Sequence, residues 1–213
     1  MRPLILLDTE TTGLDPEQHE IWEIGAIEYD GTGNHPEHLW RMEPHLASAD
    51  PAALQVGRYY ERTTKMSWHS MDKGYGREEA HYDLPGRGWA YWSQPFALAP
   101  VIARFLDGAT ILCANPTFDA GFLTAFLRQN KQAPTWHYRL RDIGSMAYGY
   151  LSACLALGAE GRDAALGLPG IDAGTDDFAR ALGVDPDQFE RHSALGDCHL
   201  LAAMLDIIEG RKS

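Results

Sequence analysis

The sequence lacks a long apolar run and has few cysteines. No stretch approaches the ~20 apolar residues that cross a bilayer, and the run Leu4–Leu7, which ends at Asp8, is too short for a signal peptide. The cysteines Cys113, Cys154 and Cys198 form no CxxC pair and lie in apolar sequence, so we expect buried thiols in a reducing compartment. We therefore predict a cytoplasmic protein with no membrane partner.

Basic residues are also scarce. The 213 residues include 18 Lys and Arg against 30 Asp and Glu, which gives a net charge of −12. Such a chain has no general attraction for nucleic acid or anionic membrane, so any contact with nucleic acid has to be local or assisted by metal ions. Two basic stretches are candidate phosphate contacts, with an ordinary solvated helix face as the alternative for each charge. They contain Arg58, Arg62, Lys65, Arg128, Lys131, Arg139 and Arg141.

The remaining composition is that of an ordinary globular protein. Hydrophobic residues make up 45% and charged residues 23% of the chain, which favours a single domain over residues 1–213. Within it, residues 63–93 form an aromatic-rich insertion with no regular pattern. Its aromatic side chains either stack on nucleotide bases or pack a small core beneath a long loop. They are Trp68, Tyr75, Tyr82, Trp89, Tyr91 and Trp92.

Apolar patterning predicts a meander of strands followed by alternating strands and helices. The continuous apolar run at 3–8 indicates a buried strand that ends in an acid. We expect an α/β fold with a mixed central sheet, in which an antiparallel meander precedes parallel strands and helices flank both. The expected strands are 3–8, 20–29, 37–43, 109–114 and about 137–140. One helix is expected to begin at Asp50, and five more are expected at 96–106, 118–129, about 143–155, 175–183 and 193–209.

A pair of acids lies where the first strand ends. Asp8 and Glu10 are two residues apart, and the two-residue period of a strand places both carboxylates on one face, where they can share a cation. An isolated Asp-x-Glu would be interpreted as a solvated strand end. The interpretation changes because two further clusters accompany this pair.

The second cluster is Asn115–Asp119, which follows the strand expected at 109–114 and opens a helix. Asp119 alone would be an ordinary first-turn acid, favoured by the helix dipole. If the sheet places this strand beside the first, Asp119 comes to lie near Asp8.

The third cluster is His192–Asp197, at the start of the last apolar run. Five residues apart on one helix, His192 and Asp197 would not share a face. We therefore expect His192 on the preceding loop and a helix that begins near Ser193, so that the imidazole can reach over the carboxylate. Taken alone, the two residues would be a surface histidine and a surface acid.

Four carboxylates and a histidine in three separated clusters suit phosphodiester cleavage. Two divalent cations about 3.5 to 4 Å apart need several shared carboxylates and stabilise both the attacking and the leaving oxygen. Oxygen ligands without cysteine favour Mg²⁺ or Mn²⁺ over zinc. A histidine side chain can accept the proton of the attacking water near neutral pH.

These clusters resemble a known enzyme family. The segments LLDTETTGLDPEQHEIWEIGAI, NPTFDAGFL and HSALGDCHLLAAML are similar, in order, to the three motifs of the DnaQ-like DEDDh exonucleases, a group that includes the proofreading epsilon subunit of DNA polymerase III. The resemblance implies a ribonuclease H-like fold and a 3′ to 5′ exonuclease that releases nucleoside 5′-monophosphates.

The resemblance also implies a role for each residue that matches a motif. Two Mg²⁺ or Mn²⁺ ions would be held by Asp8, Glu10, Asp119 and Asp197, and His192 would be the general base. The backbone of the first motif packs on the terminal nucleotide in this family, which assigns Thr11 and Gly13 to substrate binding. The implied partner is the 3′ end of single-stranded nucleic acid.

Three functions remain compatible with the sequence. The first is a metal-dependent exonuclease on DNA, and the second is an exoribonuclease with the same site, because nothing in the motifs reads the 2′-hydroxyl. The third is a proofreading or accessory subunit that docks to a DNA polymerase through residues 63–93. An intact set of site residues argues against a purely structural role.

Overall fold

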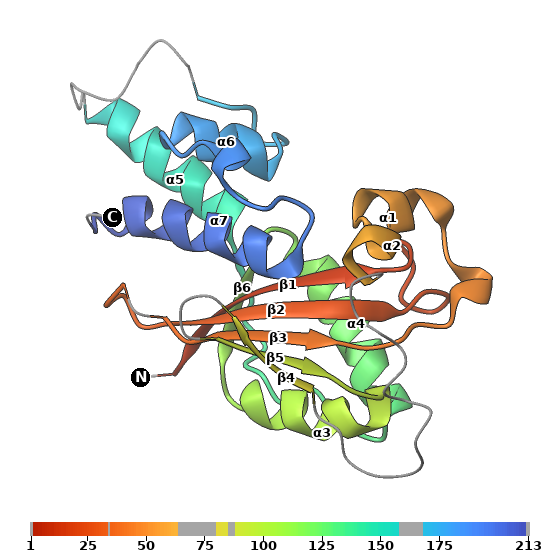
Figure 1. Cartoon of the computed structure of the whole chain (residues 1–213). Coiled ribbons are helices and arrows are strands. Elements are labelled where there is room, and N and C mark those ends of the chain that lie inside the picture. The colour runs from red at the N-terminus through yellow and green to blue at the C-terminus, as the bar shows by residue number, and fades with distance from the viewer. Residues whose placement is uncertain (1, 34, 64–79, 85–87, 158–167, 212–213) are drawn as a thin grey trace.

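The described part of the chain is built around a seven-stranded mixed sheet with the order β4-β5-β3-β2-β1-β6-β7 (Figure 1). The computed structural model describes residues 2–33, 35–63, 80–84, 88–157 and 168–211. The first three strands form the predicted antiparallel meander, and β6 and β7 continue the sheet in parallel beyond β1. The strands are β1 Leu4–Thr11, β2 Ile21–Tyr29, β3 Glu37–Arg41, β4 Ala80–Leu84, β5 Gly88–Trp92, β6 Thr110–Cys113 and β7 Arg141–Asp142.

Helices cover both faces of the sheet. On one face, Ile5 and Leu7 of β1 share a core with α3 and α4, and on the other face Leu6 shares a core with α5, α6 and α7. Because β1 is buried on both sides, its apolar run is continuous rather than alternating. The helices are α1 Pro51–Val56, α2 Tyr59–Thr63, α3 Pro95–Phe105, α4 Pro116–Gln129, α5 Ile143–Ala156, α6 Thr175–Ala181 and α7 Ala194–Ile208.

Side-chain caps set several helix starts. Asp50 accepts a hydrogen bond from the Ala52 amide, with proline at the next position, and Ser193 caps α7 by accepting from the Gly196 amide. These caps satisfy backbone N–H groups that have no partner within the helix. The predicted start of the last helix near Ser193 is thus confirmed. At α6 the N-cap is Gly174 rather than Thr175.

The structure differs from the expected elements in three places. The helix expected from Asp50 is two short helices, because Arg58 adopts a left-handed backbone (φ 53°) between α1 and α2. The short strand lies at Arg141–Asp142 rather than at 137–140. Part of the segment 63–93, expected to be irregular, forms β4 and β5, which extend the sheet beyond β3. Of the aromatic residues in this segment, Trp68 and Tyr75 lie outside the described residues.

The cysteines are all reduced. Cys113 and Cys198 are buried as expected, whereas Cys154 is only half-buried. Within the described ranges, no helix is both long and apolar enough to cross a membrane.

Candidate active site

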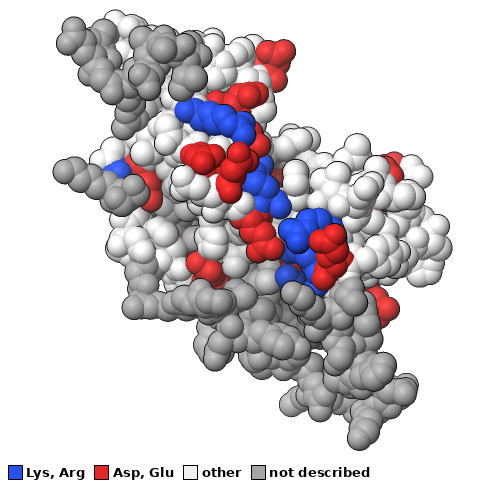
Figure 2. All heavy atoms as spheres, turned by 45° about the horizontal axis from the view of Figure 1, so that its top comes forward, with Lys and Arg blue, Asp and Glu red and all other residues white. Residues whose placement is uncertain are grey.

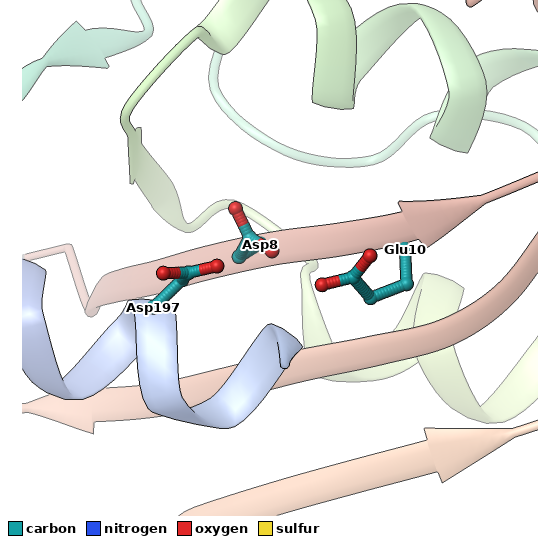
Figure 3. A group of neighbouring side chains, drawn as sticks. All are labelled: Asp8, Glu10 and Asp197. Carbon is teal, nitrogen blue, oxygen red and sulfur yellow. The ribbon is translucent and has the colours of Figure 1, made fainter. Parts of the chain in front are cut away.

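The first two acids lie at the end of β1, on the face that α7 covers. The strand extends to Thr11, so Asp8 and Glu10 are both strand residues, and the register shifts only after Glu10. Their side chains therefore share a face, as the two-residue period predicts. Figure 3 shows the Glu10 carboxylate turned toward Asp8, near the first turn of α7.

Asp197 joins this pair from the first turn of α7. One carboxylate oxygen from each of Asp8, Glu10 and Asp197 lies within 4.8 Å of the others. The close approach depends on Gly25 of β2, which pairs with Asp8: a Cβ at Gly25 would lie 2.4 Å from the backbone carbon of Ala194. The missing side chain lets the start of α7 rest directly on the sheet.

Asp119 lies near this group but outside the set of three. It is 3% exposed at the start of α4, and its Oδ1 accepts a hydrogen bond of 2.8 Å from the Thr9 hydroxyl. The Cys113 thiol is a further hydrogen-bond partner. The negative charge of Asp119 still reaches Asp8, whose pKa it helps to raise. The fold thus brings the fourth acid to the same end of the sheet, as the topology argument predicted.

His192 lies on the loop before α7, as expected. The residue is exposed and has a left-handed backbone (φ 58°). Its backbone amide donates a hydrogen bond of 3.1 Å to Asp197 Oδ2. A positive φ in a residue other than glycine is uncommon and costs energy unless its surroundings hold it. The chain therefore bends sharply at His192 and links it through the backbone to one of the clustered acids.

Two residues assigned to substrate binding have local structural roles. The Thr11 hydroxyl donates to the Gly13 carbonyl at 2.6 Å. A Cβ at Gly13 would lie 2.3 Å from the His19 ring, which accounts for glycine there. Both residues adjoin Glu10 at the end of β1, and their contact with a nucleotide remains a prediction.

Arg191, which no sequence pattern singled out, brings a positive charge to the cluster. Its guanidinium forms an ion pair with Asp197 and a second one of 2.7 Å with Asp176 of α6. This charge lowers the pKa of both Asp8 and Glu10. A single arginine next to a motif histidine forms no recognisable sequence motif. Its role can be inferred only from its position in the folded structure.

A second missed group is the buried acid Glu23 on β2, which is fully inaccessible and pairs with Arg41 and Arg62. The sequence did hold a signal, because a charged residue within the apolar strand IWEIGAI has to be paired when it is buried. Arg62, a candidate phosphate contact, is 7% exposed and committed to Glu23, so that interpretation was wrong for this residue.

Burial dominates the electrostatics of the acids. It raises the pKa of Glu10 from 4.5 to about 7, with a further contribution from the charge of Glu23. It raises the pKa of Asp119 to about 6, and that of Asp8 well above its ordinary value, with Asp119 and Glu10 adding to the effect. Closely spaced, buried carboxylates resist ionisation because each charge is poorly solvated and repels the others.

This electrostatic strain predicts a pH-dependent stability of the metal-free protein. Because the pKa of Glu10 is higher in the folded state, its contribution is fully present below about pH 4.5 and is lost as the pH rises through about 7. We expect Glu10→Gln to avoid this loss and to exceed wild type at pH 8 by about 3 kcal/mol in free energy of unfolding, with little difference at pH 4. Urea denaturation in EDTA measures both values.

Glu28→Gln is the matched control, because Glu28 lies on the neighbouring strand β2 and pairs with His38 at the surface, at 2.7 Å. It should show no comparable gain. Equal stability of wild type and Glu10→Gln at pH 8 would contradict the strained acid cluster.

The donor set fits hard divalent cations. Three carboxylates converge within 4.8 Å, a fourth lies beside them, and one guanidinium cannot balance their combined charge. Oxygen donors of this kind suit Mg²⁺ or Mn²⁺. Figure 2 shows acidic and basic side chains interleaved on one face, with no continuous basic area over the described residues in this view. A nucleic acid that binds this face would therefore meet individual charged residues rather than a continuous positive surface.

The first acidic motif has a counterpart in a known family model. The family model RNase_T, described as an exonuclease, matches residues 5–51, which contain the first acidic motif. A search of curated proteins gave no significant match.

Solved structures similar to this chain include several of exonuclease I. A zinc-bound complex of E. coli exonuclease I with single-stranded DNA matches with a TM-score of 0.67 at 19% identity, over 100% of this chain and 41% of that one. A complex of the E. coli enzyme with a dA16 oligonucleotide matches with a TM-score of 0.64 at 19% identity, over 100% and 41%. A further structure of exonuclease I, which suggests how processivity is achieved, matches with a TM-score of 0.66 at 18% identity, over 100% of this chain and 42% of that one.

This chain therefore spans about two fifths of the length of the exonuclease I chains it matches. The resemblance inferred from the three motifs is confirmed at this level: the first motif matches the exonuclease family model, and the chain has the ribonuclease H-like fold of exonuclease I.

Proposed function

We propose that this protein is a metal-dependent 3′ to 5′ exonuclease that acts on single-stranded DNA and releases nucleoside 5′-monophosphates. The observation that carries the proposal is the convergence of Asp8, Glu10 and Asp197, from β1 and α7, within 4.8 Å. Folding brings together, at the end of the sheet, acids that are nearly 190 residues apart in sequence. Their mutual electrostatic repulsion is unfavourable, and bound cations would relieve it.

In this proposal the four acids hold two Mg²⁺ or Mn²⁺ ions. Asp8, Glu10 and Asp197 supply the converging oxygens, and Asp119 supplies one from α4. Such ions, when bound, polarise the phosphate and stabilise the attacking and leaving oxygens. The negative charge of the carboxylates then no longer opposes the approach of a phosphodiester.

His192 is proposed as the general base. It is exposed next to Asp197 in the chain fold, and in this proposal its imidazole accepts the proton of the attacking water. Its amide bond to Asp197 ties its position to that of a metal ligand. Thr11 and Gly13, at the end of β1, are proposed to pack on the terminal nucleotide.

The choice of single-stranded DNA rests on the solved structures with this fold. Two of them are described as complexes of exonuclease I with single-stranded DNA or an oligonucleotide. We further propose that residues 1–213 form one domain and that the segment 63–93, which adds β4 and β5 to the sheet edge, is an insertion that influences substrate choice.

The test is hydrolysis of matched 5′-labelled DNA and RNA oligonucleotides with Mg²⁺ or Mn²⁺. We expect stepwise shortening of DNA from the 3′ end, loss of activity in EDTA and recovery with excess Mg²⁺. Shortening of RNA alone would replace DNA by RNA as the substrate. No shortening of either under any of these conditions would refute the proposal.

A further inference from the structure

The buried acid Glu23 connects the centre of the sheet to the start of α7. Its Oε2 accepts from Arg41 Nε at 2.5 Å, and its Oε1 accepts from Arg62 and from the Ala194 amide at 3.0 Å. A fully buried carboxylate is costly unless it is paired and hydrogen-bonded, and these partners meet that requirement. One of them is the backbone of the first residue of α7.

Arg62 reaches the same loop from α2. Its guanidinium donates to the His192 carbonyl at 3.2 Å and to the Gly57 carbonyl at 3.3 Å, and lies 4.9 Å from the centre of the Trp22 ring. The Glu23–Arg62 pair thus bonds the backbone on both sides of Ser193. The pair holds the chain where His192 adopts its left-handed conformation.

The pair lies beside the proposed site, because Glu23 of β2 is directly opposite Glu10 of β1. Glu23 is fully buried and Arg62 is 7% exposed, so neither is available to a nucleotide. Their bonds end on the carbonyl of His192 and the amide of Ala194, while the amide of His192 bonds Asp197. A shift of this loop would move the proposed base and one proposed metal ligand together.

We propose that Glu23 and Arg62 are positioning residues that fix His192 and the start of α7 over the acids of β1. Their effect on catalysis rests on the proposed function, whereas their effect on the loop does not. Buried ion pairs often add little net stability compared with apolar residues. The role of this pair is therefore to hold the loop in place rather than to stabilise the fold.

The kinetic test compares Arg62→Met and Arg62→Lys with wild type on a labelled DNA oligonucleotide. We expect Arg62→Met to lower kcat by up to about 10²-fold, the effect of small misplacement of a catalytic group, with KM little changed. Arg62→Lys should recover part of the loss, because it keeps the positive charge against Glu23. Arg180→Met is the control, since Arg180 pairs only loosely with Asp187 on the surface, at 3.9 Å.

A double-mutant cycle separates positioning from general stability. If Arg62 acts partly through His192, Arg62→Met should cost clearly less in a His192→Asn background than in wild type, because the two losses are not additive. The full Arg62→Met loss in that background would overturn the proposal. If Arg62→Met does not fold, Glu23→Gln enters the same cycle, with Glu28→Gln as its control.

A second measurement does not require activity. Amide hydrogen exchange of the metal-free protein should be faster at residues 192–197 in Arg62→Met, with exchange in β1 unchanged. Unchanged exchange at 192–197 would refute the positioning role. Faster exchange there, combined with an inactive wild-type protein, would support the positioning role and refute the proposed function, so the two failures are distinguishable.

Discussion

Replacing Asp8 with asparagine is expected to lower the rate of DNA hydrolysis by more than about a thousandfold while the protein remains folded. Asp8 lies between Glu10 and Asp197, so an amide there removes a negative ligand from the centre of the cluster. The stabilisation that bound metals give to the reacting oxygens is worth several kcal/mol, and each 1.36 kcal/mol is a factor of ten in rate. Single-turnover hydrolysis in Mg²⁺ gives the comparison.

The same substitution should not destabilise the metal-free protein. Burial raises the pKa of Asp8, with the charges of Asp119 and Glu10 adding to the effect, so a neutral side chain relieves an unfavourable charge. Asp107→Asn is the control, because Asp107 is exposed after α3, away from the cluster. Activity of Asp8→Asn within tenfold of wild type would remove the metal-binding role from this residue.

Removal of the His192 imidazole is expected to lower kcat by about 10² to 10⁴, the usual contribution of a general base. The backbone angle of φ 58° allows replacements that keep the fold, because asparagine and glycine tolerate the left-handed region better than other residues. His192→Asn and His192→Gly should therefore retain metal affinity and stability, and His192→Gly should be at least as stable as wild type.

Added imidazole provides the control for this prediction. His192 is exposed, so imidazole can enter the space that glycine leaves and accept the proton in its place. We expect partial recovery of activity in His192→Gly and none in Asp8→Asn. Full activity of His192→Gly without imidazole would show that another group is the base.

Local signals in the sequence predicted most of the framework. The run PLILL indicated a strand buried on both faces, and Asp50 with Pro51 and Ser193 marked two helix starts that the structure confirms. The hairpin of β4 and β5 was missed because its addition to the sheet is a pairing with β3, about 50 residues earlier in the chain. The break between α1 and α2 depends on the backbone of Arg58, which no side-chain pattern records.

Part of the arrangement of the candidate site could also be predicted from the sequence. The two-residue period placed Asp8 and Glu10 together, and the motif resemblance added Asp119, His192 and Asp197. Neither the two-residue period nor the motif resemblance could predict the groups that surround these residues. Arg62 and Glu23 are 39 positions apart, and Glu23 and Ala194 are 171 apart, so their contacts exist only in the folded chain.

The most direct test of the account is the position of bound metal. Anomalous diffraction from crystals grown with Mn²⁺ should show manganese among the carboxylates of Asp8, Glu10, Asp119 and Asp197, with the Arg191 guanidinium moved away from Asp197. The same experiment on Asp8→Asn should show weaker occupancy. Wild-type crystals with no manganese at these acids, or with manganese bound only elsewhere, would contradict the central claim.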